Sequence, residues 1–147
     1  ISGPSEGVGR GEGLVSTLDD YISFCKMILN GGIHGDHRII SRKTLDLMGA
    51  NHLVNGVDLR SCAYGRWSET SYTGVGFGLG FSVLLDPAAS QISGSVGELA
   101  WGGAASTAFW IDPLEDLAVV FLTQLVPSSQ YNIRRELRSL IYSAISD

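Results

Sequence analysis

Residues 101–124 read WGGAASTAFWIDPLEDLAVVFLTQ, and this stretch decides the fold. Two largely apolar runs flank Asp112-Pro113, a dipeptide typical of turns, and the second run covers residues 117–124. The pattern predicts a β-hairpin whose first strand is opened by Trp101-Gly102-Gly103. Because glycine has no Cβ, other groups can approach its backbone closely. A strand end of small residues therefore suits a site where a substrate lies along backbone N–H and C=O groups.

The strand pattern extends upstream of this hairpin. Over residues 77–85, large apolar side chains at every second position alternate with Gly, Gly, Ser and Leu. This period of two is typical of a half-buried strand. Residues 95–101 fit a second strand, and residues 104–112 and 117–124 fit a third and a fourth. Because the connections between them are short, neighbouring strands are expected to be antiparallel. The sequence thus predicts an antiparallel sheet of three to four strands.

Helices are predicted before and after the sheet. The first follows Ser16 or Thr17, either of which can cap it, and it ends at Asn30-Gly31-Gly32. A shorter helix follows Ser41. The last helix is expected to cover the sheet, since apolar residues at helical spacing pack against a core. Its apolar face is formed by Ile133, Leu137, Leu140, Ile141, Ala144 and Ile145, and its solvated face by Arg134, Arg135 and Arg138.

Composition excludes several classes of function. The chain of 147 residues carries a net charge of −5, whereas a nucleic-acid surface needs clustered Lys and Arg. It contains no apolar run of the length needed to span a membrane. Its 2 cysteines are too few for a disulfide framework, and Cys25 lies on the apolar stripe of the first helix, which predicts a buried free thiol.

A long irregular segment is predicted over residues 50–75. Loops of this length within a compact domain are usually functional or disordered. The segment includes Tyr64, Trp67 and Tyr72 among Gly, Ser and Asn. These aromatic side chains favour a role as one wall of a binding site.

Four short motifs, taken in order, resemble a known family. They are Gly13-Leu14-Val15-Ser16-Thr17, Leu29-Asn30-Gly31-Gly32, Trp101-Gly102-Gly103 and Phe109-Trp110-Ile111-Asp112-Pro113. Their order and spacing resemble the C-terminal part of the serine β-lactamase and penicillin-binding-protein superfamily, in the class-C-like branch that includes the family VIII carboxylesterases. The resemblance covers almost all of residues 1–147. It implies an α/β (α+β) fold with an antiparallel sheet flanked by helices, as in the β-lactamase and DD-peptidase structures.

The resemblance also implies roles for individual residues. Family members combine a Ser-x-x-Lys motif, a Tyr-x-Asn motif and a strand motif, and only the last is matched here, by Trp101-Gly102-Gly103. The backbone N–H after the strand motif helps to form an oxyanion hole, which assigns catalysis to Gly103 and Ala104. Substrate contacts are expected from Trp101 and Gly102 and from the loop aromatics Tyr64, Trp67 and Tyr72.

The expected reaction of the whole enzyme is acyl transfer from a small-molecule ester or amide through an acyl-serine. Trp101 stands where β-lactamases usually have Lys, and the loss of that cation favours neutral acyl esters over β-lactams. The nucleophile, its lysine and the tyrosine would lie on an N-terminal segment upstream of Ile1 or on a separate chain. No metal and no organic cofactor are implied.

Two other functions stay open at this point. A non-catalytic β-lactamase-like domain could bind a partner or peptide through the same sheet. Alternatively, Ser23-Phe24-Cys25-Lys26 spells Ser-x-x-Lys within this chain, although it falls in the middle of a predicted helix. His34 and His37 have no third clear ligand, so a solvated turn is favoured over a metal site. Residues 1–147 alone are expected to expose apolar surface and to self-associate or require the remainder of the enzyme.

Overall fold

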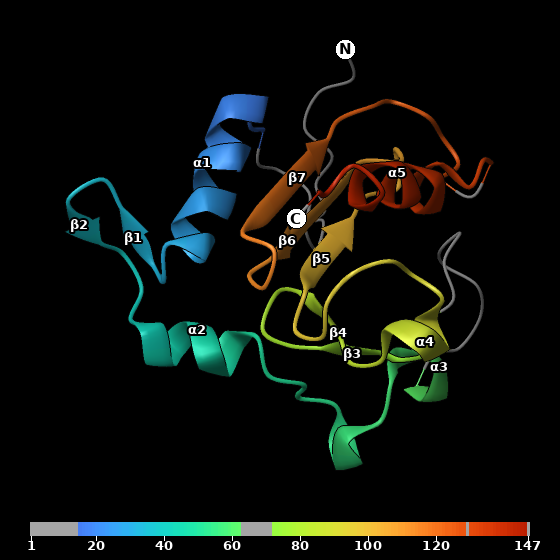
Figure 1. Cartoon of the computed structure of the whole chain (residues 1–147), viewed down its shortest axis with the longest axis horizontal. Coiled ribbons are helices and arrows are strands. Elements are labelled where there is room, and N and C mark those ends of the chain that lie inside the picture. Colours follow the sequence, from blue (N-terminus) through green and yellow to red (C-terminus); the bar gives the residue numbers. More distant parts are fainter. Residues whose placement is uncertain (1–14, 63–71, 129, 147) are drawn as a thin grey trace, which may run out of the picture.

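A five-stranded antiparallel sheet forms the centre of the structure, a computed structural model that describes residues 15–62, 72–128 and 130–146 (Figure 1). Each strand pairs with its neighbour in sequence. Their order is β3 (Val75–Phe77), β4 (Ser82–Leu84), β5 (Leu99–Gly102), β6 (Ala108–Asp112) and β7 (Leu117–Phe121). A separate two-stranded ribbon is formed by β1 (Ile33–His34) and β2 (His37–Arg38).

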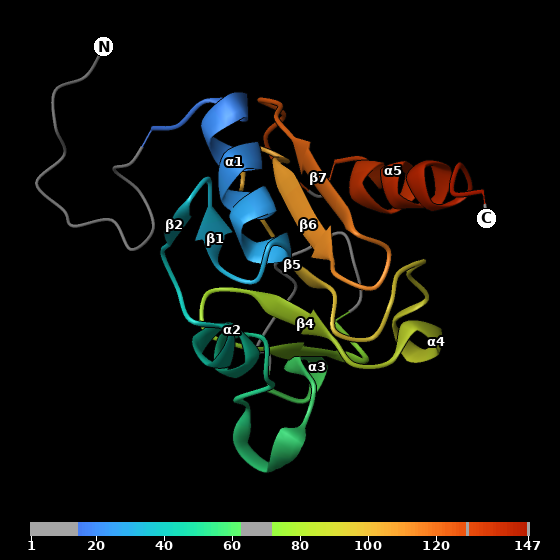
Figure 2. The same ribbon diagram turned by 60° about the vertical axis from the view of Figure 1, so that its left-hand side comes forward.

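Helices lie on both faces of the sheet, which confirms the predicted α+β class. Figure 2 shows α1 (Leu18–Leu29) on one side of β6 and β7 and α5 (Ile133–Tyr142) on the other. The shorter elements are α2 (Arg42–Met48), the 3-10 turn η1 (Val54–Gly56), α3 (Leu59–Cys62) and α4 (Pro87–Ser90).

The first two helices begin where their capping residues predict. The Thr17 side chain accepts a hydrogen bond from the backbone N–H of Asp20, at 3.2 Å. The Ser41 side chain accepts one from the N–H of Thr44, at 3.0 Å. Each bond satisfies an N–H that the first helical turn would otherwise leave without a partner. The confirmed caps thus set the residues at which α1 and α2 begin.

The main hydrophobic core lies between α1 and the sheet. Cys25, Met27 and Ile28 from the helix pack against Phe81, Val83, Leu99, Phe109 and Ile111 from the sheet side. The ring of Tyr21 meets that of Phe109 edge-to-face at 5.1 Å between centroids. Cys25 is fully buried and free, as predicted, and burial raises the pKa of its thiol to about 11.

The single strand predicted over residues 77–85 is wrong, because this segment is a hairpin of β3 and β4. Its turn closes when the N–H of Gly78 donates to the carbonyl of Phe81, at 2.8 Å. Gly80 has a φ of +92°, which favours glycine. A Cβ on Gly78 would collide with the carbonyl oxygen of Met48. The alternating pattern is real, but its glycines turn the chain back.

Trp101-Gly102-Gly103 ends one strand instead of opening the next, which corrects the predicted hairpin. Trp101 and Gly102 close β5, a turn covers residues 103–107, and β6 begins only at Ala108. The predicted turn at Asp112-Pro113 is present between β6 and β7. The Asp112 carboxylate accepts the N–H of Leu114 there, at 3.1 Å. The sheet thus contains one strand more than the upper expectation.

The C-terminal helix covers the sheet as predicted, but of the expected apolar face only Ile133, Leu137 and Ile141 are partly buried. Arg138 is buried at 8% exposure, whereas Leu140, on the expected apolar face, is 69% exposed. Ala144 and Ile145 are also exposed. The expectation of a solvated arginine face is therefore wrong for Arg138, which lies against the sheet. It is also wrong for Arg134, which donates to the carbonyls of Gly103 and Thr107 in the turn between β5 and β6. Periodicity alone could not anticipate buried polar partners on the strands.

Candidate functional site

The Trp101-Gly102-Gly103 motif lies at the end of β5, beyond the residues that pair with β4. Strand β4 pairs with β5 only at Ala100 and Leu99, so the outer edge of β5 continues beyond that pairing. On the inner side, Trp101 pairs with Phe109 and Gly102 with Ala108 of β6. The N–H of Gly103 then donates to the carbonyl of Thr107, at 3.0 Å. Beyond Ala100, the outer edge of β5 therefore has no paired strand within the described parts of the chain.

Both glycines of the motif are required by neighbouring protein groups. A Cβ on Gly102 would lie 2.8 Å from both the guanidinium carbon of Arg134 and the carbonyl oxygen of Thr107. A Cβ on Gly103 would lie 2.5 Å from the hydroxyl oxygen of Thr107. The sequence suggested that these glycines admit a substrate. The structure adds that they admit a side chain from α5 and allow the following turn to close.

The turn over residues 103–107 is held by several hydrogen bonds. The N–H of Ser106 donates to the carbonyl of Gly103, at 3.1 Å. The buried Ser106 hydroxyl donates to the carbonyl of Leu125, at 2.7 Å, and the N–H of Leu125 donates to the carbonyl of Ala105, at 3.1 Å. One terminal nitrogen of Arg134 donates to the carbonyls of Gly103 and Thr107. The turn is therefore tied to the chain beyond β7 and to α5.

Ala104 sits in this turn with its backbone N–H uncommitted. Within residues 15–62, 72–128 and 130–146, no acceptor is found for that N–H. The N–H of Gly103, one residue earlier, points inward to Thr107. The Gly103 carbonyl, in the same trans peptide unit, accepts from Arg134 and from the N–H of Ser106. The N–H of Ala104 therefore points away from Arg134.

An apolar cavity of about 250 Å³ adjoins the motif. Its walls include Tyr21 of α1, Trp101, Phe109, Val120 and Leu122, and both Gly102 and Gly103 line it as well. Trp101 is 43% exposed and meets the ring of Phe77 edge-to-face at 4.9 Å between centroids. The volume and the apolar lining of the cavity suit an apolar group of modest size.

Not every predicted site residue is brought to this place. Trp101, Gly102 and Gly103 line the cavity, and Ala104 follows them in the turn. Tyr72 does not line this cavity and instead precedes β3, where its carbonyl accepts the N–H of Val75. Tyr64 and Trp67 lie outside the described residues. Ser23 and Lys26 lie in the middle of α1, with no hydrogen bond found between their side chains in the described parts.

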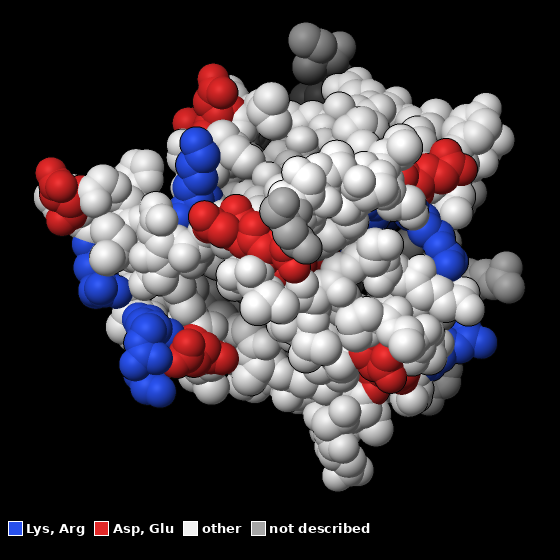
Figure 3. All heavy atoms as spheres, in the orientation of Figure 1, with Lys and Arg blue, Asp and Glu red and all other residues white. Residues whose placement is uncertain are grey.

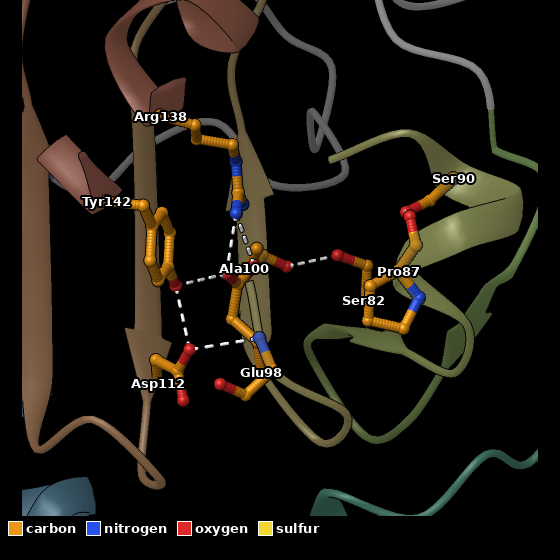
Figure 4. Close-up of polar contacts among 9 residues, drawn as sticks. Ser82, Pro87, Ser90, Glu98, Ala100, Asp112, Arg138 and Tyr142 are labelled. Carbon is orange, nitrogen blue, oxygen red and sulfur yellow. Dashed lines mark hydrogen bonds and ion pairs between the residues drawn. The ribbon is translucent and has the colours of Figure 1, made fainter. Parts of the chain in front are cut away.

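A buried polar cluster that the sequence did not predict lies beneath α5. Figure 4 shows Arg138 and Tyr142 directed toward Glu98 and Asp112. One Arg138 nitrogen lies 2.6 Å from both Glu98 carboxyl oxygens, and the Tyr142 hydroxyl lies 2.7 Å from Glu98 and 2.8 Å from Asp112. The Arg138 guanidinium also covers the Trp110 ring at 4.5 Å. Residues 134, 138 and 142 share one helical face, but this spacing alone does not distinguish a buried polar face from a solvated one.

Burial controls the protonation of this cluster. Loss of solvation raises the pKa of Glu98 despite the neighbouring guanidinium of Arg138. Loss of solvation, followed by the negative charge of Glu98, raises the pKa of Tyr142, so the phenol keeps its proton. A phenol has one proton and donates to one carboxyl at a time. The cluster is enclosed and serves to dock α5.

Charged side chains do not gather into a basic stripe on the face in Figure 3, where Lys and Arg alternate with Asp and Glu in small groups. None of the described helices is long and apolar enough to cross a membrane. Within the same residues, no group of three or more His, Cys, Asp or Glu side chains is placed to hold a metal ion.

Comparison with known proteins identifies relatives of nearly the whole chain. The family model described as Beta-lactamase matches residues 3–142. Two curated proteins of Mycobacterium tuberculosis are 34% identical over 127 residues: protein Rv1367c of strain H37Rv and the uncharacterized protein MT1414 of strain CDC 1551. The match covers 84% of this chain and 31% of each relative. The chain thus spans about a third of the length of these curated relatives.

Solved structures show the same fold. EstCE1, described as a hydrolase with promiscuous acyltransferase activity, superposes with a TM-score of 0.62 at 26% identity, covering 84% of this chain and 29% of that protein. Simvastatin synthase LovD from Aspergillus terreus superposes with a TM-score of 0.68 at 20% identity, covering 86% of this chain and 33% of that protein. The likeness to LovD concerns the fold alone.

Proposed function

This chain belongs to the Beta-lactamase family, and we propose that it supplies the oxyanion-hole strand and one substrate wall of a serine hydrolase. Family members include hydrolases and acyltransferases, as the description of EstCE1 states for that protein. The proposed reaction is transfer of an acyl group from a small-molecule ester or amide to a serine and then to water. Because this chain spans about a third of its relatives, the serine and its lysine are expected outside residues 1–147.

The observation that carries the proposal is the uncommitted N–H of Ala104 at the end of β5. The turn around it is held on both sides, and the preceding Gly102 and Gly103 line the apolar cavity. An oxyanion hole requires donors that are already oriented toward the developing negative charge, and one such donor contributes about 3–4 kcal/mol. A backbone donor needs no particular side chain, so alanine is sufficient at this position.

The proposed acyl transfer requires a serine, a base and water. The serine oxygen attacks the carbonyl carbon while its proton passes to a base, and the carbonyl oxygen becomes the anion that Ala104 stabilises. The carbonyl then reforms, the alcohol or amine leaves with a proton, and an acyl-serine remains. Water attacks this ester in the same way and releases the acid. In each tetrahedral intermediate the negative oxygen would occupy the same position at the end of β5.

The cavity and Trp101 favour a neutral, apolar acyl group. The walls formed by Tyr21, Phe109, Val120 and Leu122 are apolar or aromatic, and they offer no positive charge to a carboxylate. An apolar group gains about 25 cal/mol for each Å² of surface removed from water. A short-chain acyl ester therefore fits this wall better than an anionic β-lactam.

The test uses the full-length protein that contains this chain. It is treated with a fluorophosphonate, the modified peptide is located by mass spectrometry, and hydrolysis of p-nitrophenyl butyrate is followed in parallel. We expect one adduct on a serine outside residues 1–147, with loss of esterase activity. An adduct on Ser23 would assign the nucleophile to this chain. Absence of both adduct and hydrolysis would favour a non-catalytic binding domain instead.

A pair of variants at one position isolates the backbone donor. Ala104→Pro removes the N–H, whereas Ala104→Gly retains it and changes only the side chain. Loss of one oxyanion donor lowers kcat by about 10²–10³-fold. We expect a decrease of that order in Ala104→Pro and a much smaller change in Ala104→Gly. Equal activities in the two variants would remove Ala104 from the oxyanion hole.

A further inference from the structure

We propose that Arg134 is a positioning residue that orients and polarises the oxyanion-hole donor through the backbone. This inference rests on the proposed function of the Ala104 N–H. Arg134 lies in the first turn of α5, 31 residues after Gly103. One of its terminal nitrogens donates to the Gly103 carbonyl at 2.6 Å and to the Thr107 carbonyl at 2.9 Å. A single cationic group thus bridges the two ends of the turn.

The link to Ala104 follows from the peptide bond itself. The Gly103 carbonyl and the Ala104 N–H belong to one peptide unit, which is planar and, in this structure, trans. In a trans unit the C=O and the N–H point in opposite directions. A side chain that holds the Gly103 oxygen toward α5 therefore holds the Ala104 hydrogen toward the opposite side. The direction of the donor is set by a residue that would not touch the substrate.

Charge adds a second effect to orientation. A hydrogen bond from a cation to a carbonyl is shorter and stronger than one from a neutral donor. It draws electron density toward the carbonyl oxygen and makes the N–H of the same peptide unit a better donor, as in other hydrogen-bonded chains. The Gly103 oxygen also accepts the N–H of Ser106 at 3.1 Å, which acts in the same sense.

The glycine before this peptide makes the arrangement possible. A Cβ on Gly102 would lie 2.9 Å from the bonding nitrogen of Arg134 and 2.8 Å from its guanidinium carbon. The guanidinium therefore occupies space that any other residue at position 102 would fill. The motif and the arginine depend on each other although they lie far apart in the sequence.

The test compares Arg134→Met, which keeps most of the stem and loses the donors, with Arg134→Lys, which keeps a charge and a nitrogen donor. Arg135→Met is the matched control, because Arg135 follows on the same helix and bonds only at the surface, to Gln91 at 3.3 Å. In the full-length protein we expect Arg134→Met to lower kcat for p-nitrophenyl butyrate by about 10–100-fold, a fraction of the effect of losing the donor itself. KM should change less than twofold, and Arg134→Lys should be intermediate.

Two further readouts separate positioning from a loss of folding. Affinity for a phenylboronic acid, whose tetrahedral adduct resembles the intermediate, should fall by the same factor as kcat. Amide hydrogen exchange in a peptide spanning residues 103–108 should rise in Arg134→Met and stay unchanged in Arg135→Met. A lower melting temperature with unchanged kcat and boronate affinity would overturn the inference. Unchanged exchange in the peptide would do so as well, whatever the activity.

The same experiment distinguishes failure of the proposed function. A wild-type protein that neither hydrolyses the ester nor binds the boronic acid, but whose turn gains exchange in Arg134→Met, contradicts the proposed function and supports the role of Arg134 in holding the turn. An active wild-type protein with an equally active Arg134→Met contradicts this inference alone. The Arg134→Lys variant supplies the answer if Arg134→Met does not fold.

Discussion

Replacement of Arg138 by Met should destabilise the protein strongly, because it leaves a buried carboxyl without its cation. Glu98 is 3% exposed, and its two oxygens lie 2.6 Å from one Arg138 nitrogen. Met retains an apolar stem above the Trp110 ring, which Arg138 covers at 4.5 Å. The substitution therefore isolates the loss of the charge and its hydrogen bonds from a loss of volume.

The expected magnitude follows from the burial of both partners. Removing one member of a buried ion pair costs about 3–5 kcal/mol, since the remaining charge is left without compensation. Loss of the cation over the indole adds about 0.5–2 kcal/mol. Against a typical unfolding free energy of about 5–15 kcal/mol, this is a large fraction. Removing both partners, in Arg138→Met with Glu98→Gln, should recover much of the loss.

The dependence on pH has a defined sign. Burial raises the pKa of Glu98 in the folded protein above its ordinary value of 4.5. Above pH 4.5 the native state thus binds more protons than the unfolded chain, and this contribution to stability, full below pH 4.5, is lost as pH rises through the folded pKa. Without Arg138 the pKa of Glu98 rises further. The cost of Arg138→Met should therefore be greatest at neutral pH and decrease on acidification.

Urea denaturation of the full-length protein at several pH values measures these differences, with Arg135→Met as the control on the same helix. We expect a change within about 0.5 kcal/mol for that control, as for other surface substitutions. A cost below about 1 kcal/mol for Arg138→Met at neutral pH, or a cost that grows on acidification, would refute the reasoning. So would a double variant that is less stable than Arg138→Met alone.

Three further outcomes are expected. In the native protein, a disulfide reagent at pH 8 should modify the exposed Cys62 rapidly and Cys25 only on unfolding, because Cys25 is buried and its pKa is about 11. Rapid modification of Cys25 in a folded Cys62→Ser variant would contradict this expectation. Gly102→Ala should lower stability by about 1–3 kcal/mol through overpacking against Arg134, as measured by urea denaturation; an unchanged midpoint would show that the guanidinium can move aside. Trp101→Lys should shift the ratio of kcat/KM values toward esters that carry a free carboxylate, and an unchanged ratio would separate this side chain from substrate choice.

Local signals in the sequence predicted the elements whose stability is local. Thr17 and Ser41 cap their helices as expected, and Asp112-Pro113 forms the expected turn. The prediction of a single strand over residues 77–85 was wrong because alternation indicates which side chains are buried, not whether the chain continues straight. Gly78 and Gly80 are the residues that turn this segment back, the first through a close approach to α2 and the second through a positive φ.

The candidate site was predictable only in part, for a different reason. Trp101-Gly102-Gly103 is a contiguous motif, and the structure places it beside a cavity. Arg134 acts from 31 residues away, and its partners are backbone carbonyls that leave no trace in the sequence. Its role could be seen only once α5 was placed on the sheet. The same holds for Arg138, whose periodic spacing suggested solvent exposure.

The polar underside of α5 has a consequence for how the chain finds its final alignment. A helix with a purely apolar face can shift along a sheet by one turn with little change in free energy, since one aliphatic contact replaces another. Here Arg134, Arg138 and Tyr142 each meet a particular acceptor on or beside β5 and β6. A slip by one turn, about 5.4 Å, would bring one arginine to the acceptors of the other, but it would remove the Tyr142 hydroxyl from the Asp112 carboxylate. The polar contacts of α5 therefore help to fix its position along β5 and β6, in addition to the register that the strands set between themselves.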